Sequence, residues 1–191
     1  MQSIILASAS PRRKQLLEWA EVTFEIVVKH AEETFPPDMM MADIPVHIAR
    51  NKALAVKKSM PANKIILAAD TVVVIDNTII GKPRNREHAV TILQSLSGRK
   101  HEVITGVVIL YDDKEIAFAD VTSVVFHSLS AEQIEWYVDK YKPYDKAGAY
   151  AIQEWIGVVG IKAVTGDFYN VMGLPVSRVV QALQQIEVTR F

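Results

Sequence analysis

The segment IILAADTVVVI, Ile65–Ile75, is the clearest candidate for a buried strand in the sequence. Its length and its β-branched residues favour a strand over a helix. Asp70 and Thr71 interrupt the apolar run, and a bare carboxylate is costly to bury. We therefore expect Asp70 either to face a cleft at the end of the strand or to be held by a cation. A structural aspartate that caps a turn is the alternative, although the run continues apolar after Thr71.

Patterns before this segment predict two short strands and two helices. Ser3–Ala7 and Thr23–Val28 are typical of strands, and Asp43–Ser59 has the amphipathic spacing of a helix. Ser10 is a candidate N-cap, and Pro11 is a candidate first residue, for a helix between the two strands.

Patterns after the segment mix helices with hairpins. They predict, in order, a strand at Thr78–Ile80, a helix ended by Gly98, a hairpin of His101–Tyr111 and Ile116–Phe126, a helix capped by Ser130 and Gln133, a strand at Gly157–Ala163 and a last helix from near Pro175. Because strands and helices do not alternate strictly, we predict an α/β fold with helices packed on a mixed sheet. No linker or repeat is evident, so we expect a single domain, residues 1–191.

Composition excludes several classes of protein. The chain has 191 residues, half of them hydrophobic, which is enough for a substantial core. Its net charge of −1 provides no general basic field for nucleic acid, and the absence of cysteine excludes disulfides and thiolate metal sites. We see no signal-peptide pattern and no apolar run of about 18 residues. We therefore expect a cytoplasmic globular protein without a membrane partner.

The opening segment ILASASPRRKQLLEW, Ile5–Trp19, places three cations at the start of a predicted helix. The helix dipole is already positive there, so Arg12, Arg13 and Lys14 are destabilising unless an anion lies close to them. Backbone N–H groups, Ser8 and the two guanidinium groups would form a cradle for a polyanion. A solvated surface turn explains this stretch equally well.

Other charged residues are weaker candidates when each is taken alone. Lys82 lies in the GKPR loop, where a stiff backbone presents a point charge suited to a phosphate oxygen. Lys52 lies near Arg50, and an ordinary charged helix face explains both. Glu33 lies in an acidic loop of a kind that is usually solvated. Together, however, cations and lone carboxylates at the ends of predicted elements fit a magnesium-bound triphosphate.

Six motifs then point to a known family. The segments ASASPRRKQLL, AADTVVV, GKPRN, LSGRKHEVITGV, DKAGAYAIQ and NVMGLP occur in this order. As a set, from residue 3 to about residue 180, they resemble the Maf family of nucleoside triphosphate pyrophosphatases. The resemblance implies an elongated mixed central sheet flanked by helices, with two lobes around a cleft, as in inosine triphosphate pyrophosphatases. It also suggests a homodimer.

The resemblance further implies an activity and a set of site residues. The activity is hydrolysis of a nucleoside triphosphate to the monophosphate and pyrophosphate with a divalent metal, either magnesium or manganese, and DKAGAYAIQ resembles the branch that acts on dTTP and UTP. The implied residues are Asp70, Lys52 and Lys82 for catalysis, Ser8, Arg12, Arg13, Thr71 and Gln153 for substrate binding, and Asp70 with Glu33 for the metal. Asp70 is the implied proton acceptor.

Three other interpretations compete with a role in clearing dTTP, UTP or modified pyrimidine nucleotides from the nucleotide pool. One is a non-catalytic nucleotide-binding regulator of growth or cell division. A second is a pyrophosphatase for 7-methyl-GTP. A third is a nucleic-acid or protein-interaction module, against which the near-zero net charge argues.

Overall fold

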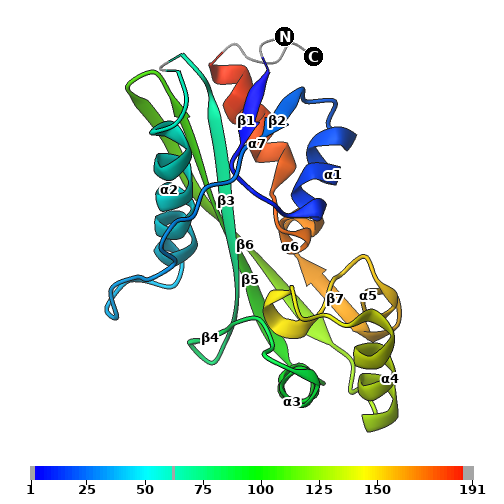
Figure 1. The fold of residues 1–191 in the computed structure, drawn as a ribbon. Coiled ribbons are helices and arrows are strands. Elements are labelled where there is room, and N and C mark those ends of the chain that lie inside the picture. Colours follow the sequence, from blue (N-terminus) through cyan, green and yellow to red (C-terminus); the bar gives the residue numbers. More distant parts are fainter. Residues whose placement is uncertain (1–2, 62, 187–191) are drawn as a thin grey trace. The chain divides into compact units, whose positions relative to one another are not determined.

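The computed structural model describes residues 3–61 and 63–186. Seven strands in this part of the chain belong to one sheet (Figure 1). They are β1 Ile4–Leu6, β2 Phe24–Ile26, β3 Ile66–Ile75, β4 Thr78–Ile80, β5 Lys100–Tyr111, β6 Lys114–Phe126 and β7 Ile161–Thr165.

Helices lie between most of these strands and after the last of them. They are α1 Pro11–Trp19, α2 Asp43–Lys57, α3 Arg86–Leu96, α4 Ala131–Tyr141, the 3₁₀-helix η1 Ala147–Ala149, α5 Trp155–Gly160, α6 Phe168–Met172 and α7 Val176–Gln185. None of the helices in the described part of the chain has the length and apolarity that crossing a membrane requires.

The sheet is mixed, as the sequence predicted. Its strand order is β2-β1-β3-β5-β6-β7, and β4 pairs with β3. Strand β1 is parallel to both β2 and β3, whereas the β3–β4 and β6–β7 pairs are antiparallel. Strands β5 and β6 are neighbours joined by only two residues, as expected of a hairpin. The predicted α/β class with helices flanking a mixed sheet is therefore confirmed.

The chain divides into two compact units. Of the described residues, the first contains 3–61, 63–71, 105–120 and 173–186, and the second contains 72–104 and 121–172. Strands β3, β5 and β6 each contribute residues to both units. The expectation of two lobes agrees with this division, whereas the cleft stays a prediction.

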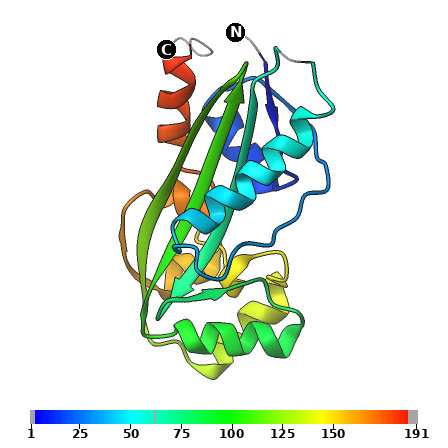
Figure 2. The same cartoon turned by 90° about the vertical axis from the view of Figure 1, so that its left-hand side faces the viewer.

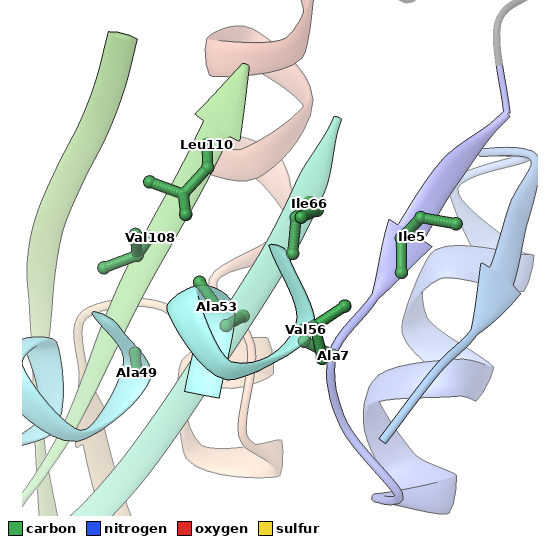
Figure 3. Close-up of a cluster of buried hydrophobic side chains, with 9 residues drawn as sticks. Ile5, Ala7, Ala49, Ala53, Val56, Ile66, Val108 and Leu110 are labelled. Atoms are coloured by element: carbon green, nitrogen blue, oxygen red, sulfur yellow. The ribbon is translucent and has the colours of Figure 1, made fainter. Parts of the chain in front are cut away.

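The core of the first unit forms between α2 and three strands. Ala49, Ala53 and Val56 of α2 pack in one buried cluster with Ile66 of β3 and Val108 of β5. Figures 1 and 2 show α2 along the face of these strands, and Figure 3 shows its small side chains directed at them, with α7 behind. Alanine side chains are small, so the helix can lie close to the sheet. Because the apolar face of α2 packs on the strands, the directions of its polar side chains are set as well.

Gly106 marks a close approach between α2 and β5. A Cβ atom at this position would lie 2.1 Å from the backbone nitrogen of Val46 and 2.2 Å from the carbonyl carbon of Pro45. These are backbone atoms in the first turn of α2, so they cannot rotate away as a side chain would. Only glycine fits here without moving the helix.

Local capping follows the sequence prediction. The Ser10 hydroxyl accepts a hydrogen bond from the Arg13 N–H, and Pro11 is the first residue of α1. At α4, Ser130 and Gln133 form the complete capping box. These contacts satisfy backbone donors that a helix leaves unpaired at its start.

One predicted strand is wrong in its first half. Residues 157–160 belong to the helix α5, and β7 begins only at Ile161. The valines at 158 and 159 favour a strand locally, but a Cβ atom at Gly157 would lie 1.7 Å from the Ile152 carbonyl oxygen. Tight packing of this glycine on the preceding turn overrides the local preference. The short helix α6 was also not predicted.

A buried histidine lies in the second unit. His101 is 2% exposed, its ring meets Phe126 and Tyr150 edge to face, and its Nε2 lies 2.7 Å from the Tyr150 hydroxyl. Burial lowers the pKa of His101 from 6.5 to about 4. The folded state therefore holds this ring neutral at a pH where the unfolded chain begins to bind a proton.

We expect Gly106→Ala to destabilise the protein by about 3 kcal/mol, because the added methyl group collides with the backbone of α2. This corresponds to a fall in Tm of about 6–12 °C, measurable by calorimetry. Gly81→Ala is the matched control, since no atom lies within 4 Å of a Cβ at that position. Equal melting temperatures for the two variants would contradict the close approach.

We expect the stability contributed by a neutral His101 to be complete above pH 6.5 and to be lost as the pH falls toward 4, by roughly 3 kcal/mol in total. The sign follows because the unfolded chain binds the proton first. His101→Gln keeps a polar partner for Tyr150 but does not titrate. In denaturant titrations, the stability of the wild type relative to this variant should decline between pH 6.5 and 4, and a constant difference would refute the burial effect.

Candidate active site

Asp70 lies in the middle of a continuous strand and is held by a lysine. It is only partly exposed within β3, and its Oδ1 accepts a hydrogen bond from the Lys52 ammonium at 2.6 Å. The sequence left three explanations open for this carboxylate, which are a strand end, a cation or the cap of a turn. The structure selects the cation, because β3 runs without interruption from Ile66 to Ile75.

Lys52 joins two carboxylates. Its Nζ also contacts the Glu33 carboxylate at 2.7 Å. Glu33 belongs to the irregular segment before α2, and the neighbouring Glu32 carbonyl accepts a hydrogen bond from the Asn51 side chain of α2 at 3.3 Å. A turn of α2 therefore holds this acidic segment against the Lys52–Asp70 pair. Glu33, which alone is a weak candidate in sequence, becomes part of a cluster.

Arg50 and Lys52 have different roles although they are two residues apart. The Arg50 guanidinium forms a two-nitrogen contact with the Glu115 carboxylate of β6, with the shortest distance 2.7 Å. The hydrogen bond to Glu115 raises the pKa of Arg50. Arg50 thus belongs to an ion pair on the helix surface, whereas Lys52 faces Asp70.

Arg13 is the only buried member of the three cations at the start of α1. Its Nε donates to the Gly173 carbonyl at 2.8 Å, and its two terminal nitrogens donate to the Ser8 hydroxyl at 3.1 Å and the Thr71 hydroxyl at 3.0 Å. These three acceptors are neutral, so they orient the guanidinium without cancelling its charge. The alternative of a solvated surface turn does not apply to Arg13.

The charges of the buried Arg13 and of Asp70 attract each other. Burial lowers the pKa of Arg13, and the attraction of Asp70 partly offsets this effect. A guanidinium group nevertheless stays charged at physiological pH. Positive potential is therefore fixed next to Asp70 by an arginine that cannot rotate into solvent.

Strand pairing explains why these residues meet. Strand β1 is parallel to β3, with Leu6 opposite Leu67. The chain segments that follow these two residues therefore run in the same direction. This register brings Ser8 within reach of the same arginine as Thr71. The Ser8 hydroxyl also accepts from the Ser10 N–H at 3.2 Å, which ties the loop to the start of α1.

The other two cations of the opening segment are less confined. Arg12 is half-buried beside Arg13 on the first turn of α1. Lys14 is exposed and pairs with Glu18 one turn later at 3.6 Å. Such an exposed pair contributes little to stability. Lys14 therefore has a local partner along the helix, and the role predicted for Arg12 in substrate binding stays a prediction.

Lys82 and Gln153 belong to the second unit, where both side chains are exposed. Their loops meet there, because the Gly148 N–H donates to the Gly81 carbonyl at 3.2 Å. Pro83, next to Lys82, is buried and anchors its loop. The structure thus joins the GKPR and DKAGAYAIQ motifs, which are more than 60 residues apart in the chain. The other site residues that the sequence analysis named belong to the first unit.

The Asp70–Glu33 pair fits a hard divalent cation. Both carboxylates contact one Nζ, so they face a common point, and carboxylate oxygens are the ligands that magnesium and manganese prefer. Within residues 3–61 and 63–186, no group of three or more histidine, cysteine, aspartate or glutamate side chains could hold a metal ion. Magnesium is often bound through one or two carboxylates with substrate phosphates and water completing the shell, so two carboxylates suffice.

Sequence reasoning missed two partners of this site. The Thr105 hydroxyl lies 2.9 Å from that of Thr71, and the Gly173 carbonyl accepts from both Arg13 and Thr71. Both residues occur in quoted motifs, but neither was assigned a role. A polar residue in the apolar VITGVVIL run was the available signal for Thr105. No local pattern identifies a backbone carbonyl as a ligand.

The chain is similar over nearly its whole length to known proteins that share one name. The dTTP/UTP pyrophosphatase of Cytophaga hutchinsonii is 51% identical over 183 residues, covering 96% of this chain and 84% of that protein. The dTTP/UTP pyrophosphatase of Parabacteroides distasonis is 47% identical over 95% of this chain and 94% of its own length. The protein of the same name from Bacillus cereus is 45% identical over 98% of this chain and 97% of its own length.

A solved structure and a family model complete the comparison. The fold is similar to that of the Staphylococcus aureus Ham1 protein, with a TM-score of 0.54 over 97% of this chain and all of that one, at 16% identity. The family model described as Maf-like protein matches residues 3–186. With that match over nearly the whole sequence, the chain belongs to the Maf-like protein family.

Proposed function

We propose that this protein hydrolyses dTTP and UTP to the monophosphate and pyrophosphate, and so removes these or modified pyrimidine nucleotides from the nucleotide pool. One observation carries the proposal: the Asp70 carboxylate is held by Lys52 beside Glu33, next to the buried charge of Arg13. Relatives at 45–51% identity that are named dTTP/UTP pyrophosphatase support the choice of substrates.

The proposed reaction needs a general base for water. Water attacks the α-phosphorus, a new P–O bond forms, and the bond to the β-phosphate oxygen breaks, so that pyrophosphate leaves. Asp70 accepts the proton that the water loses. Its Oδ1 is occupied by the Lys52 ammonium at 2.6 Å, which orients the carboxylate and leaves Oδ2 to meet the water.

Cations would stabilise the charge that develops on the phosphates. Arg13 uses three of its five N–H groups on protein acceptors, so one on each terminal nitrogen is available for phosphate oxygens. We assign Arg12 and Lys82 to the same purpose, because a guanidinium and an ammonium both suit phosphate. Groups fixed before the substrate arrives need no reorganisation during the reaction.

A divalent metal, magnesium or manganese, belongs to this proposal. Asp70 and Glu33 would hold it, and substrate phosphates and water would complete its ligand shell. When bound, such an ion supplies positive charge beside the phosphates. Lys52 would then keep both carboxylates in place.

Base selection is assigned to Gln153. Its amide is exposed in the DKAGAYAIQ loop and offers both a donor and an acceptor. The uracil and thymine edges present a complementary imide, with an N3–H donor beside the O4 acceptor, whereas cytosine has an acceptor at N3 and an amino donor at C4. A site that pairs with the imide should reject cytosine because polar groups would be left unpaired. Thr71, whose hydroxyl accepts a hydrogen bond from Arg13, is the second residue assigned to substrate contact.

Three expectations from the sequence stay predictions. They are that residues 1–191 act as one catalytic domain, that the protein forms a homodimer, and that it is cytoplasmic without nucleic-acid or membrane partners. The match of one family model to residues 3–186 supports the first.

Asp70→Asn and Lys52→Gln should each lower kcat for dTTP at least about a hundredfold, because one removes the base and the other releases it. Steady-state release of pyrophosphate with magnesium measures the effect. Arg50→Gln is the matched control on the same helix, since its partner is Glu115 away from Asp70, and it should keep kcat within about twofold. Near-wild-type turnover by Asp70→Asn would remove the residue from the role of base.

A panel of dTTP, UTP, CTP, GTP and 7-methyl-GTP should show preference for the first two, measured as kcat/KM for pyrophosphate release. Chelation with EDTA should abolish turnover, and magnesium or manganese should restore it, because the two carboxylates repel the triphosphate unless a divalent cation offsets the negative charges. Preference for 7-methyl-GTP would overturn the proposed substrates. Binding of dTTP in calorimetry without any release of pyrophosphate would instead favour a non-catalytic regulator.

A further inference from the structure

Gln153 lies in a four-residue turn. The Glu154 N–H donates to the Ala151 carbonyl at 3.1 Å, which closes the turn with Gln153 at its third position. Ala151 and Ile152 are buried and Glu154 is half-buried, so Gln153 is the one exposed member of the four. The direction of its amide therefore depends on how firmly the turn is fixed.

One hydroxyl group fixes both ends of this turn. The Tyr137 hydroxyl donates a hydrogen bond to the Glu154 carboxylate and accepts one from the Ala151 N–H at 3.2 Å. Tyr137 comes from α4, and Ala151 and Glu154 are the first and last residues of the turn. A single side chain thus joins the two ends of the turn that carries Gln153.

The geometry around Glu154 makes this contact specific. Glu154 precedes the first residue of α5, yet its side chain makes no cap for that helix. The carboxylate is turned to Tyr137 instead, and its other oxygen lies 3.6 Å from the Lys146 ammonium. The Glu154 carboxylate therefore contacts groups of the second unit that lie before the helix, and its contact with Tyr137 serves the turn.

Tyr137 is itself tightly packed. Its side chain is fully buried, and its ring stacks on that of Tyr141 one turn later, with centroids 4.9 Å apart. Burial and the Glu154 carboxylate raise the pKa of Tyr137, so the hydroxyl keeps its proton and can donate. A packed aromatic side chain on a helix holds its hydroxyl group in a more precise position than a side chain on a loop would.

We propose that Tyr137 is a positioning residue for nucleobase selection, because its hydroxyl holds both ends of the turn that presents Gln153. The proposal rests on the proposed function, in which Gln153 contacts the pyrimidine. Its consequence is that selectivity depends on a buried residue 16 positions before the base-contacting amide, on a different element of the fold.

The test is Tyr137→Phe, which removes one oxygen atom and keeps the ring. We expect KM for UTP and dTTP to rise about fivefold or more with kcat within about twofold, and the preference for UTP over CTP in kcat/KM to fall by a similar factor. Tyr141→Phe is the matched control in the same stack, and both KM and preference should stay at wild-type values.

A double-mutant cycle separates positioning from general stability. If Tyr137 acts through Gln153, then Tyr137→Phe should change selectivity little in a Gln153→Ala background. Additive effects of the two substitutions on selectivity would overturn the proposal. A merely structural role would instead lower kcat for all nucleotides alike, and that result would also overturn it.

Glu154 provides a second route should Tyr137→Phe fold poorly. Glu154→Gln keeps an acceptor for the Tyr137 hydroxyl and should retain most of the selectivity, whereas Glu154→Ala should lose it to the same degree as Tyr137→Phe. Equal selectivity in the two Glu154 variants would count against the proposal. If the wild type released no pyrophosphate from dTTP or UTP, the proposed function would fail. Wild-type turnover with unchanged selectivity in Tyr137→Phe would refute this inference alone.

Discussion

The ion pair between Lys52 and Asp70 is the contact on which the first unit depends. A carboxylate in the middle of a buried strand would strongly destabilise the fold if it had no partner. The ammonium supplies that partner, and it can do so only because α2 lies close to β3. Alanines on the inner face of α2 and Gly106 on β5 allow this approach. Packing of apolar groups therefore positions the charged ones.

The second organising contact is the buried guanidinium of Arg13. It links the loop after β1, the centre of β3 and the backbone before α7 through Ser8, Thr71 and Gly173. All three acceptors are neutral, which leaves a fixed positive charge beside a fixed negative one. Burial makes such an arrangement costly for stability, and it is typical of a functional site. In the second unit, the hydroxyl group of the buried Tyr137 holds the turn that carries Gln153.

Local sequence rules predicted most of the elements because those elements agree with their local preferences. The Ser10 cap, the capping box of α4 and the apolar strand β3 were all confirmed. The failure at residues 157–160 has a specific cause. Two valines favour a strand, but Gly157 packs closely against the carbonyl of Ile152, and the residues from Trp155 to Gly160 form a helix. A contact made by the backbone overrode the side-chain preference.

The sequence by itself determined the α/β class, the family and the residue types of the site, because apolar periodicity, caps and ordered motifs are local properties of the chain. Only the tertiary structure decided which charges share a partner. It separated Lys52 from Arg50, two positions apart on one helix, and gave Arg13 three distant acceptors. Tyr137 could not have been assigned to the turn of Gln153 from spacing alone. Such pairings depend on the register between strands and the closeness of helices, which are set by packing over the whole core and not by neighbouring residues in the chain.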